Sequence, residues 1–214
     1  MNISTDLRLP LAEYLQETHP KDLIVLHHTV GGTAKSTFDY WRTDPRRVGT
    51  AYIVDRDGTI YEVFPSDRWC FHLGLKGARG RVDMRSIGIE IASEGALTYR
   101  DGKLYCFDVI SPRTEFPKEK ALDLGYIWRG YRYFDKYEMA QMDAVCELVS
   151  YLIQHFSIPA VTPVEHTTFN DRLRDFQGII AHSHVRSDKS DVHPGFSWET
   201  LMTRCGLTTS PMPK

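Results

Sequence analysis

The sequence predicts a single α/β domain in which a central mixed β-sheet is flanked by helices. Three observations support this prediction. Short apolar runs of strand length recur along the chain, segments with helical periodicity alternate with them, and an Asp-Gly pair between two runs indicates a β-hairpin. A chain of 214 residues suits one domain with a sizeable core. Because a hairpin is antiparallel and strand–helix–strand units are parallel, the predicted sheet is mixed.

The first elements follow from an apolar run and a capping residue. Residues 7–16 form a short amphipathic lead-in, and residues 23–26 are a continuous branched apolar run, typical of a strand buried on both faces. Thr33 is placed to cap a helix that extends to about Trp41. Residues 51–54 and 59–63 then form the predicted hairpin.

The second half of the chain begins with another short buried strand at residues 86–91. The pattern weakens over residues 92–133, where residues 99–104 indicate a second hairpin and the remainder is predicted as an aromatic-rich loop. A connection of this length within a compact domain is often functional. The helices and strand predicted beyond it are at residues 137–156, 179–181 and 198–205.

Composition excludes several classes of function. A formal net charge of −2 gives no general attraction to nucleic acid or to an anionic membrane, and no apolar run is long enough to insert into a membrane. The first residues lack the pattern of a secretory signal, so we expect synthesis and residence in the cytoplasm. The four cysteines lack a C-x-x-C spacing and are expected to be reduced and mostly buried.

Polar residues at the ends of three apolar strands are the candidate site. His27 and His182 each follow a short strand, Asp191 comes soon after the second histidine, and Glu90 lies within the strand at residues 86–91. Two imidazoles and a carboxylate leave a fourth position open, which is what a catalytic zinc requires. A neighbouring glutamate would supply the proton-transfer group. The combination indicates a metal-dependent hydrolase.

Each of these residues also has a plainer interpretation. A lone His27 is more often a hydrogen-bonded core histidine, and a lone Asp191 is more often a turn or helix-capping residue. His28 alternates to the other face of its strand, so one histidine of that pair is expected to be a ligand and the other to pack. His184 lies on the same face as His182 if that strand continues.

The motifs and their order resemble those of the zinc-dependent N-acetylmuramoyl-L-alanine amidases, which include phage lysozyme-type enzymes, peptidoglycan-recycling amidases and peptidoglycan-recognition proteins. The resemblance covers about residues 23–198. It rests on the ordered segments I-V-L-H-H-T, T-A-Y-I-V-D-R-D-G-T-I-Y-E, C-F-H-L-G, S-I-G-I-E, A-H-S and K-S-D. It implies the peptidoglycan-recognition-protein-like amidase fold, with residues 1–214 as one catalytic domain, a core at about 23–205 and an insertion at about 92–133.

The resemblance also implies a zinc cofactor (Zn²⁺) and its ligands. His27, the first histidine of the H-H pair, matches the first ligand, His182 the second and Asp191 the third. Family members commonly have the ligand aspartate directly before Pro-Gly, whereas Val192 and His193 intervene here. His193 is therefore a rival third ligand, although it has no matching position in the family.

Three further residues match functional positions of the family. Glu90 matches the catalytic glutamate, Lys189 the basic residue that steadies the developing oxyanion, and His72 the histidine of a W-H-x-G segment that lines the substrate groove. Some relatives use a tyrosine from another strand in place of the glutamate, and Tyr52 is the candidate for that role here. The histidine that many members carry in the hairpin strand is missing.

The resemblance implies hydrolysis of the amide bond between N-acetylmuramic acid and L-alanine in peptidoglycan or muropeptides. We expect a cell-wall-lytic endolysin, released to the wall through a phage holin. The alternatives are a cytoplasmic muropeptide-recycling amidase, a peptidoglycan-binding module without activity, and a zinc peptidase that cuts another amide. No nucleic-acid partner and no organic cofactor are implied, and oligomeric state is left open.

Overall fold

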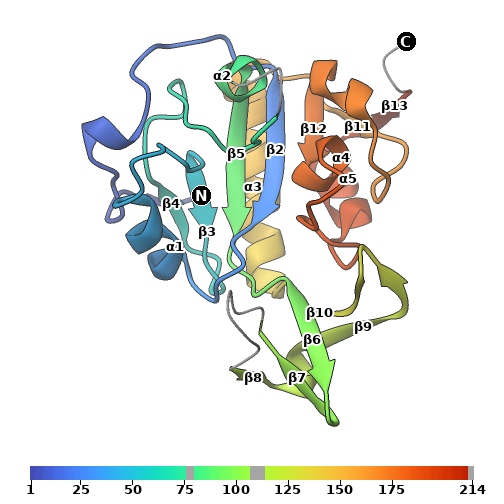
Figure 1. Ribbon diagram of the computed structural model, residues 1–214. Helices are drawn as coiled ribbons and strands as arrows, with labels where there is room; N and C mark the ends of the chain where they lie inside the picture. The colour runs from blue at the N-terminus through green and yellow to red at the C-terminus, as the bar shows by residue number, and fades with distance from the viewer. Residues whose placement is uncertain (76–79, 107–113, 212–214) are drawn as a thin grey trace.

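The computed structural model describes residues 1–75, 80–106 and 114–211, and its largest element is a six-stranded sheet (Figure 1). The strands lie in the order β1-β4-β3-β5-β2-β12. Their bounds are β1 (Ile3–Ser4), β4 (Ile60–Glu62), β3 (Tyr52–Val54), β5 (Ser86–Ile91), β2 (Leu23–His28) and β12 (Gly178–Ala181). β3, β5, β2 and β12 run parallel, whereas β4 pairs antiparallel with β3 through the Asp-Gly hairpin. The mixed sheet and this hairpin confirm the prediction.

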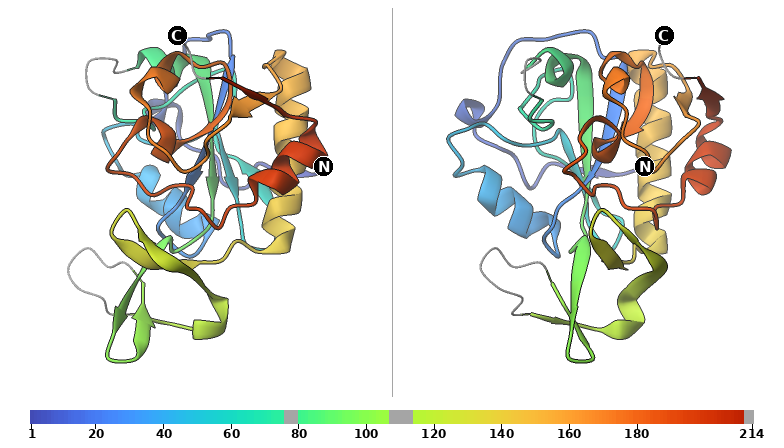
Figure 2. Two further views of the ribbon diagram at one scale, coloured as in Figure 1. Left: turned by 90° about the vertical axis from the view of Figure 1, so that its right-hand side faces the viewer. Right: turned by 45° about the vertical axis from the view of Figure 1, so that its right-hand side comes forward.

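Side-chain alternation divides the sheet into two buried faces. On one face, Ile24 and Leu26 of β2 join a core cluster with α3 (Met139–Phe156) and α5 (Trp198–Cys205). On the other face, Leu23 and Val25 pack in a second cluster, together with Leu73, Leu75, Val82, Leu173, Phe176, Ile180 and Val185. Figure 2 shows α3 lying along one side of the sheet. A strand buried on both faces explains the continuous apolar run that predicted β2.

The helices begin and end close to the predicted residues. α1 (Ala34–Trp41) is capped by Thr33, whose side chain accepts a hydrogen bond from the Ser36 amide. α3 and α5 match the two predicted later helices, and the lead-in contains only the 3₁₀ turn η1 (Leu11–Glu13). The short elements that complete the fold are α2 (Arg81–Arg85), β11 (Val161–Pro163), η3 (Asp171–Asp175), α4 (His182–Val185) and β13 (Thr208–Ser210).

The predicted insertion is a second sheet and not mainly a loop. Its five antiparallel strands, in the order β8-β7-β6-β10-β9, project below the central sheet in both views of Figure 2. They are β6 (Ala96–Arg100), β7 (Lys103–Tyr105), β8 (Glu115–Phe116), β9 (Ala121–Trp128) and β10 (Tyr131–Asp135), with the 3₁₀ turn η2 (Lys118–Lys120) before β9. The β6–β7 hairpin confirms the second predicted hairpin, but the aromatic-rich loop prediction was wrong. Residues 107–113 of the insertion lie outside the described residues.

Within the described ranges, the structure has no helix both long and apolar enough to cross a bilayer. Cys70, Cys146 and Cys205 are free thiols, and Cys70, Cys106 and Cys146 are buried.

Candidate metal centre

The carboxyl ends of three parallel strands bring the candidate residues to one edge of the central sheet. His27 lies near the end of β2 and pairs in register with Glu90 of β5, while His182 directly follows β12. Alternation places these side chains on the face opposite α3, the face of the second core cluster. The edge beyond the carboxyl ends of parallel strands is where α/β sheets build their sites.

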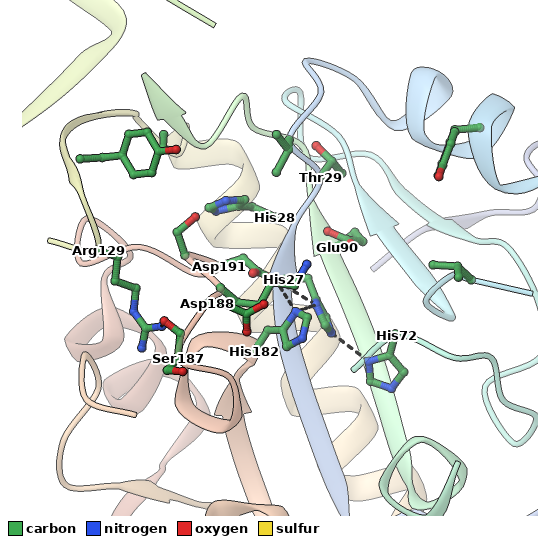
Figure 3. A pocket seen from close by; sticks show the side chains of 17 residues that line it. His27, His28, Thr29, His72, Glu90, Arg129, His182, Ser187, Asp188 and Asp191 are labelled. Carbon is green, nitrogen blue, oxygen red and sulfur yellow. Dashed lines mark hydrogen bonds and ion pairs between the residues drawn. The ribbon is translucent and has the colours of Figure 1, made fainter. Parts of the chain in front are cut away.

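Three side-chain atoms at this edge form a nearly equilateral triangle (Figure 3). The Nδ1 atoms of His27 and His182 lie 3.1 Å apart, and each lies 3.0 Å from Oδ2 of Asp191. A tetrahedral zinc with bonds of about 2.0–2.1 Å separates its ligand atoms by roughly 3.3 Å. Among the described residues, this His-His-Asp cluster is the group found with metal-ligand spacing. The donor set therefore fits zinc with one position left open.

Hydrogen bonds behind the triangle orient both imidazoles. Nε2 of His182 donates to the Leu73 carbonyl at 3.0 Å, which leaves Nδ1 unprotonated and free to bind a metal. Nε2 of His27 lies 2.9 Å from Nδ1 of His72, and Nε2 of His72 lies 2.8 Å from Oγ of Ser86. The tautomer that satisfies this chain has His27 donating to His72 and His72 donating to Ser86. His27 then also presents an unprotonated Nδ1.

The protonation states of His27 and Asp191 are those that a metal ligand needs. Burial lowers the pKa of His27 to about 4, so its ring is neutral near pH 7. Burial by itself would raise the pKa of Asp191, but the charge and hydrogen bond of His182, together with His27, hold it well below its ordinary value. A neutral His27 ring and an ionised Asp191 carboxylate bind zinc without first losing protons.

The triangle opens into a pocket of about 730 Å³ that Glu90, Lys189 and His72 also line. Oε2 of Glu90 is buried and has no hydrogen-bond partner among the described residues. Burial raises the pKa of Glu90 well above its usual value; Asp191 raises it further and Lys189 opposes the shift. A carboxylate in this state is suited to take up a proton and release it again.

Two histidines weighed against the ligands lie outside the donor triangle, although His28 lines the same pocket. The ring of His28 lies on the α3 face, where Nδ1 is 3.0 Å from the Tyr137 hydroxyl. His193 uses both ring nitrogens outside the triangle: Nε2 donates to the Asp135 carbonyl at 3.0 Å and Nδ1 accepts from the Gly195 amide at 3.1 Å. The rival third ligand is therefore not placed to bind the metal.

The positions of two further residues, His184 and Tyr52, also bear on the candidate site. The strand β12 ends at Ala181 and the chain turns into α4, so the strand does not continue and the condition for His184 to share a face with His182 is not met. The Tyr52 hydroxyl bonds to Glu62 and Ser66 and does not line the pocket, so it is no substitute for Glu90.

The insertion contributes residues to the pocket that sequence reasoning missed. Arg129 and Tyr131, on either side of the β9–β10 turn, line its wall together with Ala96 of β6. Arg129 and Gly130 both have positive φ angles, 50° and 87°, as the tight turn of a two-residue hairpin requires. An Arg-Gly pair between two runs of β-forming residues was the available signal.

Several solved structures resemble this fold, and two of them are described as N-acetylmuramoyl-L-alanine amidases. AmiD from E. coli, solved with anhydro-N-acetylmuramic acid-L-Ala-D-γ-Glu-L-Lys, has a TM-score of 0.57 and 20% identity over 90% of this chain. The chain spans only 60% of that protein. PlyL has a TM-score of 0.56 at 15% identity, with 96% of this chain and 97% of PlyL covered. LysC from Clostridium intestinale URNW has a TM-score of 0.52 at 14% identity, with 97% and 99% covered.

These likenesses show the fold, and the family follows from the sequence itself. No curated protein matches the chain significantly. The sequence profile described as N-acetylmuramoyl-L-alanine amidase matches residues 17–195, which include the whole donor triangle and Glu90. The protein belongs to the N-acetylmuramoyl-L-alanine amidase family.

Proposed function

We propose that the protein is a zinc-dependent amidase that hydrolyses the bond between N-acetylmuramic acid and L-alanine, with His27, His182 and Asp191 as the zinc ligands. The observation that carries the proposal is the triangle of donor atoms 3.0–3.1 Å apart, opening beside an unpartnered Glu90 carboxylate in one pocket. Membership of the amidase family supplies the substrate bond.

The residues of the pocket divide the chemistry between them. A zinc ion held by the triangle would activate water and polarise the scissile carbonyl. Glu90 takes the proton from the attacking water, which its raised pKa favours, and then delivers that proton to the leaving amine. The Lys189 ammonium lines the same pocket and stabilises the negative charge that develops on the carbonyl oxygen. His72 holds the ring of His27 in its metal-binding orientation.

We further propose that the substrate is the intact cell wall, as for an endolysin. LysCS from Clostridium intestinale is described as an endolysin amidase. Its structure matches with a TM-score of 0.52 and 15% identity, and the match covers 97% of each chain. A likeness over both full lengths supports the same kind of catalytic unit. The recycling alternative differs in substrate, because it predicts a preference for soluble anhydro-muropeptides over sacculi.

Metal analysis and product analysis test the proposal together. Wild type should retain about one zinc per chain after dialysis, and His27→Ala and His182→Ala should each lose most of it. His155→Ala, which changes an exposed histidine of α3, is the matched control and should bind zinc like wild type. Full zinc occupancy in either ligand variant contradicts the assignment.

Analysis of the digestion products shows which amide bond is cut and whether sacculi or soluble muropeptides are the substrate. Sacculi digested by the wild type should release peptides with a free N-terminal L-alanine, identified by mass spectrometry. Cleavage within the stem peptide would indicate a zinc peptidase, and binding without cleavage would indicate a binding module. Turnover of soluble anhydro-muropeptides with sacculi left intact would favour the recycling role.

A further inference from the structure

The chain segment at residues 182–193, called here the ligand segment, carries two of the three proposed zinc ligands and Lys189. Between α4 and Asp191 it has no regular secondary structure, and Ser187 and Asp188 are exposed. Apart from the bond from the Arg186 amide to the His182 carbonyl, 3.1 Å, which closes α4, its own backbone supports are two. They are the bond from the Ser183 amide to the Asp191 carbonyl, 2.6 Å, and that from the Lys189 amide to the Arg186 carbonyl, 3.4 Å. An irregular segment of this kind needs external contacts to hold a ligand in place.

The turn of the β9–β10 hairpin supplies such contacts through one side chain. Nη1 of Arg129 donates to the carbonyls of Arg186, 2.8 Å, and Ser187, 2.6 Å, and Nη2 donates to the Ser183 carbonyl, 2.8 Å. Figure 3 shows Arg129 extending toward Ser187 at the side of the pocket. Three of the five N–H donors of the guanidinium are thus bonded to the ligand segment.

The Arg129 side chain also packs against the ring of Trp128. Its guanidinium carbon lies 4.9 Å from the centre of the Trp128 ring, and the Trp128 indole donates to the Thr167 carbonyl at 3.2 Å. Arg129 is half-buried, and burial lowers its pKa, yet in the described part of the chain it forms no ion pair with a carboxylate. A cation placed against carbonyls alone indicates that its hydrogen bonds, and not a charge pair, fix its position.

The other end of the ligand segment is held by the same hairpin. His193 donates from Nε2 to the carbonyl of Asp135, the last residue of β10, and its ring stacks on Tyr137 with ring centres 4.5 Å apart. The Asp135 carboxylate is in turn paired with Arg56 of the central domain and accepts from the Glu94 amide at 2.7 Å. The hairpin therefore contacts the segment on both sides of Lys189 and Asp191.

We propose that the insertion braces the ligand segment and that Arg129 is the positioning residue of this brace, acting on Asp191 and Lys189 indirectly, through the carbonyls of Ser183, Arg186 and Ser187. The inference rests on the proposed function, because it concerns the placement of those two groups. A substrate-binding role for Arg129 is the competing interpretation. It fits less well, because most of the guanidinium donors are already bonded to the chain.

The test compares Arg129→Ala with Arg132→Ala, a control on the same hairpin. The Arg132 side chain is exposed and bonds to Asp123 within the hairpin at 2.6 Å, away from the ligand segment. In metal-free protein, Arg129→Ala should speed amide hydrogen exchange in residues 183–191 by at least ~10-fold, and Arg132→Ala should not. Unchanged exchange in Arg129→Ala overturns the brace, whether or not the protein binds zinc.

Zinc and kinetic measurements then separate positioning from substrate contact. Arg129→Ala should weaken zinc binding by about 10–100-fold in chelator competition, the range seen when support of a ligand is removed. It should lower kcat while KM changes little. A raised KM with unchanged zinc affinity would show substrate binding instead, and a lowered Tm with unchanged zinc affinity and kcat would show a merely structural role. A wild type without zinc would refute the proposed function and leave the exchange result to decide the brace.

Discussion

Glu90 is a carboxylate at the end of a buried strand with one oxygen that no described group satisfies. Such an atom costs stability, so its presence in a pocket indicates a functional use, and an amide in its place cannot accept a proton. We therefore expect Glu90→Gln to retain the fold and the zinc but to lose hydrolysis by about 10²–10⁴-fold. Circular dichroism, metal analysis and kcat on sacculi fragments measure the three properties. Near wild-type turnover would mean that a different group takes the proton.

His184 links acidity to folding. Its Nε2 donates to the His166 carbonyl at 2.8 Å and its Nδ1 accepts from the Ala181 amide at 3.1 Å, an arrangement that only the neutral ring satisfies. Burial lowers its pKa from 6.5 to about 4. As the pH falls, His184 takes up a proton in the unfolded chain before it does so in the folded protein. The stabilisation that the neutral His184 ring provides is therefore complete above pH 6.5 and is lost as the pH falls toward 4.

The measurement is the free energy of unfolding of metal-free protein against pH. We expect the decline between pH 6.5 and about 4 to be shallower in His184→Asn than in wild type, by up to roughly 3 kcal/mol across the window. Any constant cost of the substitution cancels in this comparison. Parallel curves for the two proteins would contradict the neutral buried ring.

For single residues, the sequence indicated which side chains form the candidate site. It did not indicate the contacts that orient those side chains. His27 and His182 follow apolar runs that can only be buried strands, so their convergence at one sheet edge was predictable. The Leu73 carbonyl that orients His182 was not, because any residue type has a carbonyl and only the folded chain places it. The contact of His72 with His27 was hidden for a related reason, since it depends on a loop far away in sequence.

The ends of two helices provide a matched pair of substitutions at the scale of elements. α3 is followed by the capping residue Ser157 and α5 by Gly206, both in the left-handed region with φ of 55° and 63°. A left-handed conformation is unfavourable for a residue with a Cβ atom, and nothing lies within 4 Å of a Cβ built on Gly206. Ser157→Gly should therefore stabilise the protein by about 0.5–1 kcal/mol, and Gly206→Ser should destabilise it by a similar amount. Urea unfolding measures both, and changes of the same sign would contradict this account.

The insertion was predicted mainly as a loop but forms a sheet, and this shows which strands a sequence pattern does not reveal. β9 and β10 lack a continuous apolar run, because much of β9 is exposed: Tyr126 and Ile127 are 54% and 73% accessible. The strands are fixed by pairing, such as Tyr133 with Leu97 of β6, between residues far apart in the chain. The central strands were predictable because each is buried along its own length.

The two sheets have separate cores, which predicts how the molecule responds when one is removed. Leu97, Leu104, Cys106 and Phe116 form a cluster of their own in the insertion. Because Leu97 pairs with Tyr133 across β6 and β10, an Asn-Gly turn can join them in place of residues 98–132. This variant keeps Asp135 and its partner Arg56. It should still unfold cooperatively on heating, monitored by circular dichroism, and loss of cooperativity would show that the insertion is part of the main core.

The adjacency of those two strands has a further consequence for variation of the chain. A segment that leaves and re-enters a domain at neighbouring points adds little closure entropy, so the insertion as a whole is thermodynamically easy to exchange. The length of the β9–β10 hairpin within the insertion is more restricted. Each residue removed from both β9 and β10 shortens the hairpin by about 3.4 Å, which is more than the span of a hydrogen bond. Arg129 would then no longer reach the Ser183 carbonyl. Length changes should therefore be tolerated at the β7–β8 side of the insertion and not between β9 and β10.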